Sequence, residues 1–171
     1  MDLLARLGRI TARKLTASKI RIHGDYHLGQ VLSTGSDFVI FDFEGEPVRP
    51  LSERRLKRSP VRDVAGMIRS YHYAAFAALL SGLAVREKDA ALLEPWADLW
   101  YKHSCGAFLR GYLETVRGSG LAPDDEEGFE NLLVPYLLEK AVYEMGYEMN
   151  NRPAWLVIPL RGIAYLCGGE E

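Results

Sequence analysis

The residues most able to do chemistry lie in two short acidic motifs. The first, His23-Gly-Asp-Tyr-His-Leu-Gly-Gln30, is a polar loop that carries the carboxylate of Asp25 and the amide of Gln30. The second, Phe41-Asp-Phe-Glu-Gly-Glu46, carries Asp42. In phosphoryl transfer, one carboxylate orients the attacking hydroxyl and takes its proton, and another holds magnesium on the nucleotide phosphates. Two converging aspartates would therefore favour phosphoryl transfer, whereas incidental acids on a hairpin are the alternative.

A β-hairpin is the element that would bring the two motifs together. Two β-rich runs, 31–33 and 38–42, flank a Gly/Ser/Asp turn at 34–37. This pattern is typical of a hairpin. Because the second run returns along the first, Asp25 and Asp42 can converge at one end. A short extended run at 19–23 leads into the first motif.

The remainder of the chain shows the apolar spacing of helices. Breaks are predicted near Pro95 and at Pro135, and the acidic residues 124–127 suit a helix amino terminus. Residues 44–62 contain three prolines and clustered basic residues, which indicates a loop. The predicted fold is mainly α with one β-hairpin, in a single domain over 1–171. Helices are predicted over 2–16, 61–82, 87–117 and 124–150, with a last helix or turn over 154–167.

The composition fits a globular protein of ordinary size. The 171 residues are 48% hydrophobic and 26% charged, with a net charge of −2, so nothing argues for nucleic acid or an anionic membrane as partner. Cys105 and Cys167 are predicted to be buried thiols, not a disulfide, which fits a reducing compartment. There is no signal-peptide core and no apolar run near the roughly 18 residues of a membrane span. We expect a cytoplasmic protein.

The two motifs resemble those of the aminoglycoside phosphotransferase and choline kinase families, which show His-Gly-Asp-x-His-x-x-Asn, a hairpin and then Ile-Asp-Trp/Phe-Glu. Within that group the chain most resembles maltokinases. The resemblance rests on Gln30 in place of the usual Asn, on Asp-Phe-Glu-Gly-Glu-Pro from Asp42, and on Lys57-Arg-Ser-Pro-Val-Arg-Asp-Val-Ala-Gly66. Since Gln is one methylene longer than Asn, an identical metal geometry does not follow. Maltokinases occur alone or fused to trehalose synthase.

The resemblance implies a role for each acidic residue. Asp25 would be the catalytic base, and Gln30 and Asp42 would bind Mg²⁺, with Glu44 assisting the metal or fixing the loop. ATP would be the phosphoryl donor, and maltose 1-phosphate the product.

His23 and His27 would support the loop instead of taking part in the chemistry. A histidine beside a catalytic loop commonly bonds backbone carbonyls and holds the turn.

A third match to maltokinases lies on the predicted helix over 124–150. Lys140, Tyr143 and Tyr147, here called the sugar face, are spaced i, i+3 and i+7 and share one side of a helix. Aromatic rings can stack on a pyranose while an ammonium donates to its hydroxyls. In the resembling family this face contacts maltose. On spacing alone, a core-facing stripe with Lys140 paired to Glu144 is the alternative.

Two further features are open to more than one interpretation. The basic loop could bind phosphate or an acidic partner, or could be a solvated loop, and the tryptophans 96, 100 and 155 fit the core or an interface. Asp63 is predicted to lie near a helix start and to be structural. The basic loop comprises Arg49, Arg54, Arg55, Lys57, Arg58 and Arg62.

The resemblance covers only the carboxy-terminal lobe of a protein-kinase-like fold. The amino-terminal lobe that grips the nucleotide is missing, so we expect the chain to be inactive alone and to self-associate through uncovered apolar surface. The leading hypothesis is the catalytic lobe of an ATP-dependent maltokinase. The alternatives are a non-catalytic module that binds maltose or docks on trehalose synthase, and a kinase lobe for another small alcohol or amine.

Overall fold

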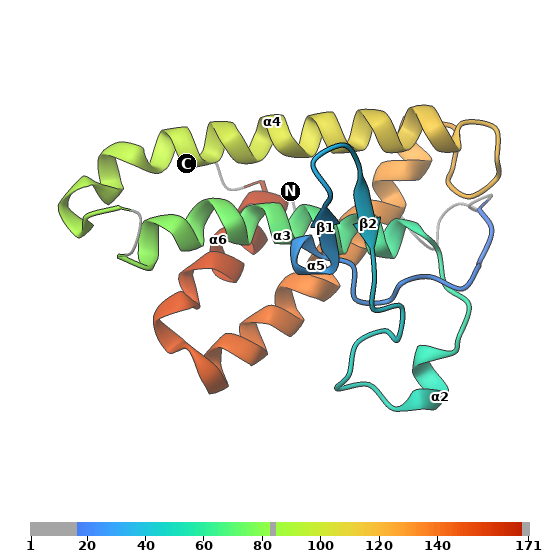
Figure 1. Ribbon diagram of the computed structural model, residues 1–171, viewed down its shortest axis with the longest axis horizontal. Helices are drawn as coiled ribbons and strands as arrows, with labels where there is room; N and C mark the ends of the chain where they lie inside the picture. The colour runs from blue at the N-terminus through green and yellow to red at the C-terminus, as the bar shows by residue number, and fades with distance from the viewer. Residues whose placement is uncertain (1–16, 83–84, 169–171) are drawn as a thin grey trace.

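The computed structural model describes residues 17–82 and 85–168 (Figure 1). The predicted helix over 2–16 lies outside these residues. Within them the chain is mainly helical with one antiparallel pair of strands, as predicted. The strands are β1 (Val31–Ser33) and β2 (Phe38–Ile40), and the helices are α2 (Leu51–Arg54), α3 (Val61–Leu80), α4 (Ala90–Val116), α5 (Glu126–Asn151) and α6 (Val157–Leu166). Short 3₁₀ turns lie at Leu28–Gln30, Glu87–Asp89 and Pro153–Trp155.

The hairpin pairs the two β-rich runs in antiparallel register. Val31 pairs with Ile40 and Ser33 with Phe38. The Thr34 amide donates to the Asp37 carbonyl at 2.9 Å, which closes the turn. The extended run before the first motif pairs through one bridge, Ile20 with Arg58, and forms no longer strand. The predicted hairpin is therefore confirmed.

The core forms around α3, which contacts α4, α5 and α6. One apolar face of α3, including Val61 and Val64, packs against a set of leucines on α5 that includes Leu133 and Leu137. By contrast, α4 buries only Cys105 among its 27 residues. Trp96 and Trp100 on that helix are 67% and 47% exposed, so these two tryptophans are not core residues.

Two predicted helix breaks were wrong, because α4 and α5 continue through Pro95 and Pro135. A proline within a helix costs about 3 kcal/mol, so tertiary contacts must offset that cost. Beside Pro95, Glu94 forms an ion pair with Arg161 of α6. Pro135 lies in the part of α5 that packs into the core.

The starts of α5 and α2 can be compared with the sequence predictions. At the start of α5 the Asp125 side chain accepts a hydrogen bond from the Gly128 amide at 2.9 Å, so the predicted acidic cap is confirmed. The short helix α2 lies within the segment predicted to be a loop. It follows Pro50, which is its N-cap and has an extended backbone with φ −62° and ψ 150°.

The predictions about cysteines and membrane spans can be compared with the described residues. Cys105 and Cys167 are both thiols, but of the two only Cys105 is buried as predicted, because Cys167 at the end of α6 is half-buried. Burial raises the pKa of Cys105 to about 12. No helix within 17–82 or 85–168 is long and apolar enough to cross a bilayer.

Gly66 on α3 packs closely against the first motif. A Cβ placed there would lie 2.6 Å from the Tyr26 carbonyl oxygen. We expect Gly66→Ala to lower the free energy of unfolding by about 1–3 kcal/mol, since the loop or the helix must shift. Urea denaturation followed by circular dichroism measures the change.

Gly106→Ala on α4 is the matched control, because nothing lies within 4 Å of its added Cβ. That variant should be neutral or stabilised by up to about 1 kcal/mol through helix propensity. Equal stability changes in the two variants would contradict the close contact between the loop and α3.

Candidate active site

Asp63, in the first turn of α3, anchors the loop that carries Asp25. Its two carboxylate oxygens accept the amides of His23 at 2.7 Å and Gly24 at 2.9 Å. Burial raises the pKa of Asp63, while these hydrogen bonds oppose the rise. The structural role predicted for Asp63 is confirmed, but its hydrogen bonds with the first motif were not predicted.

The His23 side chain connects the first motif to the second. The residue is 5% exposed, and its Nε2 lies 2.8 Å from the carbonyl oxygen of Phe41. Its Nδ1 accepts the Asp25 amide at 3.4 Å. The ring also packs against Phe43, with centroids 4.8 Å apart. Both ring nitrogens therefore have backbone partners, one within the first motif and one in the second.

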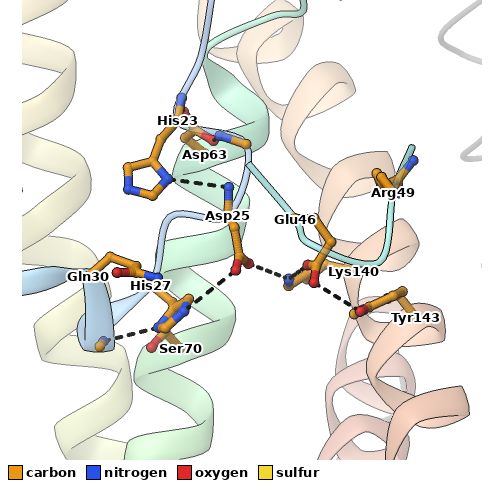
Figure 2. A network of polar contacts seen from close by, with 12 residues as sticks. His23, Asp25, His27, Gln30, Glu46, Arg49, Asp63, Ser70, Lys140 and Tyr143 are labelled. Atoms are coloured by element: carbon orange, nitrogen blue, oxygen red, sulfur yellow. Dashed lines mark hydrogen bonds and ion pairs between the residues drawn. The ribbon is translucent and has the colours of Figure 1, made fainter. Parts of the chain in front are cut away.

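His27 shapes the turn that follows Asp25. Its Nδ1 accepts the Gly29 amide at 3.0 Å, and its Nε2 lies 3.8 Å from the Asp25 carboxylate. The Leu28 amide donates to the Ser70 hydroxyl of α3 at 3.0 Å. Figure 2 shows this turn beside Asp25. The loop is thus fixed on α3 on both sides of Asp25.

Lys140 and Tyr143 of the sugar face lie next to Asp25 and Glu46 (Figure 2). The Lys140 ammonium lies 3.4 Å from the Asp25 carboxylate and 3.2 Å from that of Glu46. The Tyr143 hydroxyl donates to Glu46 at 3.1 Å. Burial and the charge of Glu46 raise the pKa of Tyr143 to about 12, so the phenol keeps its proton near neutral pH. Glu46 belongs to the second motif, yet the sequence interpretation gave it no role.

Tyr147, the third member of the sugar face, lies away from this cluster. Its ring is 5.5 Å from the Arg152 guanidinium, and the residue is 48% exposed. Seven residues advance a helix by about 10 Å, which places Tyr147 about two turns beyond Lys140. Glu144 does not pair with Lys140 as in the alternative interpretation, because it bonds Arg69 at 2.7 Å. A sugar contact of Tyr147 stays a prediction.

Gln30 and Asp42 lie together at the base of the hairpin. The Gln30 amide nitrogen donates to an Asp42 carboxylate oxygen at 3.0 Å, which leaves the amide oxygen outside that bond. Asp42 has a φ of 64°, the only positive φ among described non-glycine residues. Such backbone conformations are uncommon and concentrate at functional sites. One carboxylate and one amide oxygen form a donor set that suits Mg²⁺, which usually takes its other ligands from water and phosphate.

Glu44 lies elsewhere. It is exposed and lines a separate hollow with Arg21 and Arg54. Within 17–82 and 85–168, no three His, Cys, Asp or Glu side chains are grouped so that they could hold a metal ion. The assistance of Glu44 to a metal stays a prediction.

A pocket extends from Asp25 along α5, and we call it the acceptor pocket. Its free volume is about 30 Å³, room for one or two water molecules. Lys140, which pairs with Asp25 and Glu46, is among the residues that line it. A larger ligand would require lining side chains to move. The lining residues are Gly24, Asp25, Tyr26, Glu46, Arg49, Arg62, Asp63, Gly66, Tyr136, Glu139, Lys140 and Tyr143.

No family model matches the chain, but individual proteins are similar to it. A glucosamine kinase of Streptacidiphilus jiangxiensis is 26% identical over 159 residues, which is 92% of this chain and 33% of that protein. A glucosamine kinase of Mycolicibacterium smegmatis is 49% identical over 57 residues, 33% of this chain and 14% of that protein. The chain therefore spans about a third or less of the curated relatives that it matches.

Solved structures of glucosamine kinase share the fold. One, in crystal form B, has a TM-score of 0.72 and 26% identity, over 95% of this chain and 38% of that one. Another, in complex with glucosamine, ADP and inorganic phosphate, has a TM-score of 0.67 and 22% identity, over 95% of this chain and 37% of that one. The fold is thus that of part of a sugar kinase.

Proposed function

We propose that this chain is the carboxy-terminal catalytic lobe of an ATP-dependent sugar kinase of the cytoplasm. The observation that carries the proposal is the Asp25 carboxylate in the lining of the acceptor pocket, on a loop fixed by Asp63 and Ser70. Its Oδ1 lies 3.4 Å from Lys140 of the sugar face. The similar fold of a kinase that binds glucosamine, ADP and phosphate supports the same assignment.

In the proposed reaction, a sugar hydroxyl lies within about 2.6–3.2 Å of Asp25. Asp25 accepts the hydroxyl proton as the oxygen bonds to the terminal phosphorus of ATP, and the bond from that phosphorus to ADP breaks. Lys140 holds the Asp25 carboxylate in place and donates to the sugar.

Gln30 and Asp42 would hold Mg²⁺ through their side-chain oxygens. When bound, the ion neutralises charge on the phosphates. The Gln30–Asp42 hydrogen bond at 3.0 Å keeps these two side chains adjacent.

Glucosamine is the acceptor that the acceptor pocket supports best. Glu46 places a carboxylate next to Asp25, and it already binds the Lys140 ammonium at 3.2 Å. An amino sugar could offer its own ammonium to Glu46, with Lys140 turned to a hydroxyl. The similarity to glucosamine kinases supports this assignment.

Maltose is the second candidate. The sequence motifs shared with maltokinases support it. Tyr143 supports it as well, because its ring could pack on a pyranose. If the substrate is maltose, the resemblance to maltokinases also implies trehalose synthase as a partner.

A coupled assay of ADP release by the complete gene product tests the proposal, with ATP, Mg²⁺ and either glucosamine, maltose or choline. We expect turnover with glucosamine at the highest kcat/KM. Faster turnover of maltose would assign the second candidate. Turnover of choline alone, or binding of sugar without turnover, would overturn the proposal.

The Glu46→Gln variant tests the assignment of glucosamine. It should raise KM for glucosamine about tenfold or more, since a hydrogen bond to a charged group contributes about 1.5–3 kcal/mol. The effect on a neutral sugar should be much smaller. The same assay measures both, with Glu130→Gln, an exposed position on α5, as the matched control. Equal changes for charged and neutral sugars would contradict an ammonium contact at Glu46.

A further inference from the structure

A second hollow, distinct from the acceptor pocket, lies beside the second motif, and we call it the arginine hollow. It has a volume of about 460 Å³, within the usual range of small-ligand sites. Three segments form it: the run before the first motif, the residues after Asp42, and α2 with its carboxyl end. The lining residues are Arg21, Phe43, Glu44, Leu51, Arg54 and Arg55.

The arginine hollow carries excess positive charge. Three guanidiniums line it against one carboxylate, that of Glu44. Among residues 17–82 and 85–168, Arg21, Arg54 and Arg55 form no ion pair. In the acceptor pocket, by contrast, Arg49 and Arg62 both bind Glu139, at 3.1 and 2.7 Å. Within the basic loop, Arg49 and Arg62 are therefore neutralised by a carboxylate, whereas Arg54 and Arg55 are not.

Two of the guanidiniums are held in place by the backbone. Arg21 donates to the Phe43 carbonyl at 3.5 Å, and Arg54 donates to the Glu44 carbonyl at 3.3 Å. Guanidiniums bind phosphate oxygens well, because several N–H groups point the same way.

The arginine hollow also has an apolar wall. Phe43 and Leu51 are 52% and 54% exposed, and Phe43 is supported by the His23 ring. An organic group attached to a phosphate could pack on this wall. We propose that the arginine hollow binds a small phosphomonoester, with the phosphate on the arginines and the organic group on Phe43 and Leu51.

Such a ligand would lie next to the metal-side aspartate. Phe43 follows Asp42 directly, and His23 contacts both Phe41 and Phe43. A phosphomonoester in the arginine hollow would therefore contact the second motif through Phe43. This inference does not depend on which sugar is phosphorylated.

Isothermal titration calorimetry of the 171-residue chain at low ionic strength tests the proposal. The probes are inorganic phosphate, glucose 6-phosphate and AMP. The variant is Arg21→Gln/Arg55→Gln, which leaves Arg54 and its contact with Glu44 intact. The matched control is Arg110→Gln, an exposed arginine on α4. Circular dichroism verifies that each variant is folded.

We expect at least one probe to bind, with about tenfold or more weaker affinity in the double variant and unchanged affinity in the control. Tighter binding of an organic phosphate than of inorganic phosphate would support contact with Phe43 and Leu51, and Phe43→Ala should then remove that difference. Absence of binding by all three probes would overturn the proposal. So would equal affinity in the double variant and the wild type, or tighter binding of inorganic phosphate than of either ester.

Discussion

Asp25→Asn in the complete gene product should reduce phosphoryl transfer by about 10²–10⁴-fold, the usual contribution of a general base. The substitution removes the proton acceptor but conserves the shape of the side chain. Lys140 keeps its second carboxylate, Glu46 at 3.2 Å, so the acceptor pocket should retain its form. Sugar affinity should therefore stay close to that of the wild type. Coupled ADP release measures turnover, and calorimetry measures sugar binding.

Asp98→Asn is the matched control for this experiment. Asp98 lies on α4 and pairs with Lys102 at 2.6 Å, away from the acceptor pocket. That variant should turn over like the wild type. Near-normal turnover of Asp25→Asn would mean that another group accepts the proton, and loss of sugar binding would mean that Asp25 mainly holds the pocket together.

Local patterns predicted the hairpin and the positions of α3, α4, α5 and α6. A Gly/Ser/Asp turn between two β-rich runs is typical of a hairpin. The apolar positions that predicted α3 form its buried face in the structure. The apolar spacing does not show whether a helix ends at Pro95 or Pro135. Whether a proline ends a helix depends on contacts with other helices, such as Glu94 with Arg161, and a local pattern does not contain them.

The candidate site was predictable only where it follows the motifs. Asp25 and Gln30 lie on the predicted loop, and spacing brought Lys140 and Tyr143 to one side of α5. Glu46 was missed, because its partners Lys140 and Tyr143 are more than 90 positions away in sequence. The one available signal was that a third carboxylate closes the Asp-Phe-Glu-Gly-Glu motif.

The hydrogen bonds from the first motif to Asp63 were missed for a similar reason. An acid in the first turn of a helix already has a local explanation. Its bonds to the His23 and Gly24 amides depend on how the loop crosses α3. That crossing is close only because Gly66 has no side chain to meet Tyr26.

Arg69 and Glu144 form a buried ion pair that joins α3 to α5, one turn beyond Lys140. Their side chains are 3% and 11% exposed, and two hydrogen bonds of 2.9 and 2.7 Å connect them. A Cβ on Gly162 of α6 would overlap the Arg69 guanidinium, so α6 packs directly on the pair. Burial raises the pKa of Glu144, and Arg69 opposes that rise.

Arg69→Met should lower the free energy of unfolding by about 3–5 kcal/mol, because it leaves a buried carboxylate without its cation. Without Arg69, the pKa of Glu144 in the folded state should rise further above its unfolded value. The native state then binds more protons than the unfolded state, so stability falls as pH rises through the folded pKa. We therefore expect the variant to be more stable in mild acid than at neutral pH. Urea denaturation at several pH values measures both effects.

A second variant separates the loss of charge pairing from a general loss of packing. Arg69→Met/Glu144→Leu replaces the pair by apolar side chains, which is often neutral or stabilising relative to a buried ion pair. It should recover most of the lost stability and the pH dependence should disappear. Arg161→Met, which breaks the more exposed pair with Glu94, should cost about 1 kcal/mol or less through that pair. If Arg69→Met and the double variant were equally unstable at every pH, the loss would come from packing around Gly162 and not from the unpaired charge of Glu144.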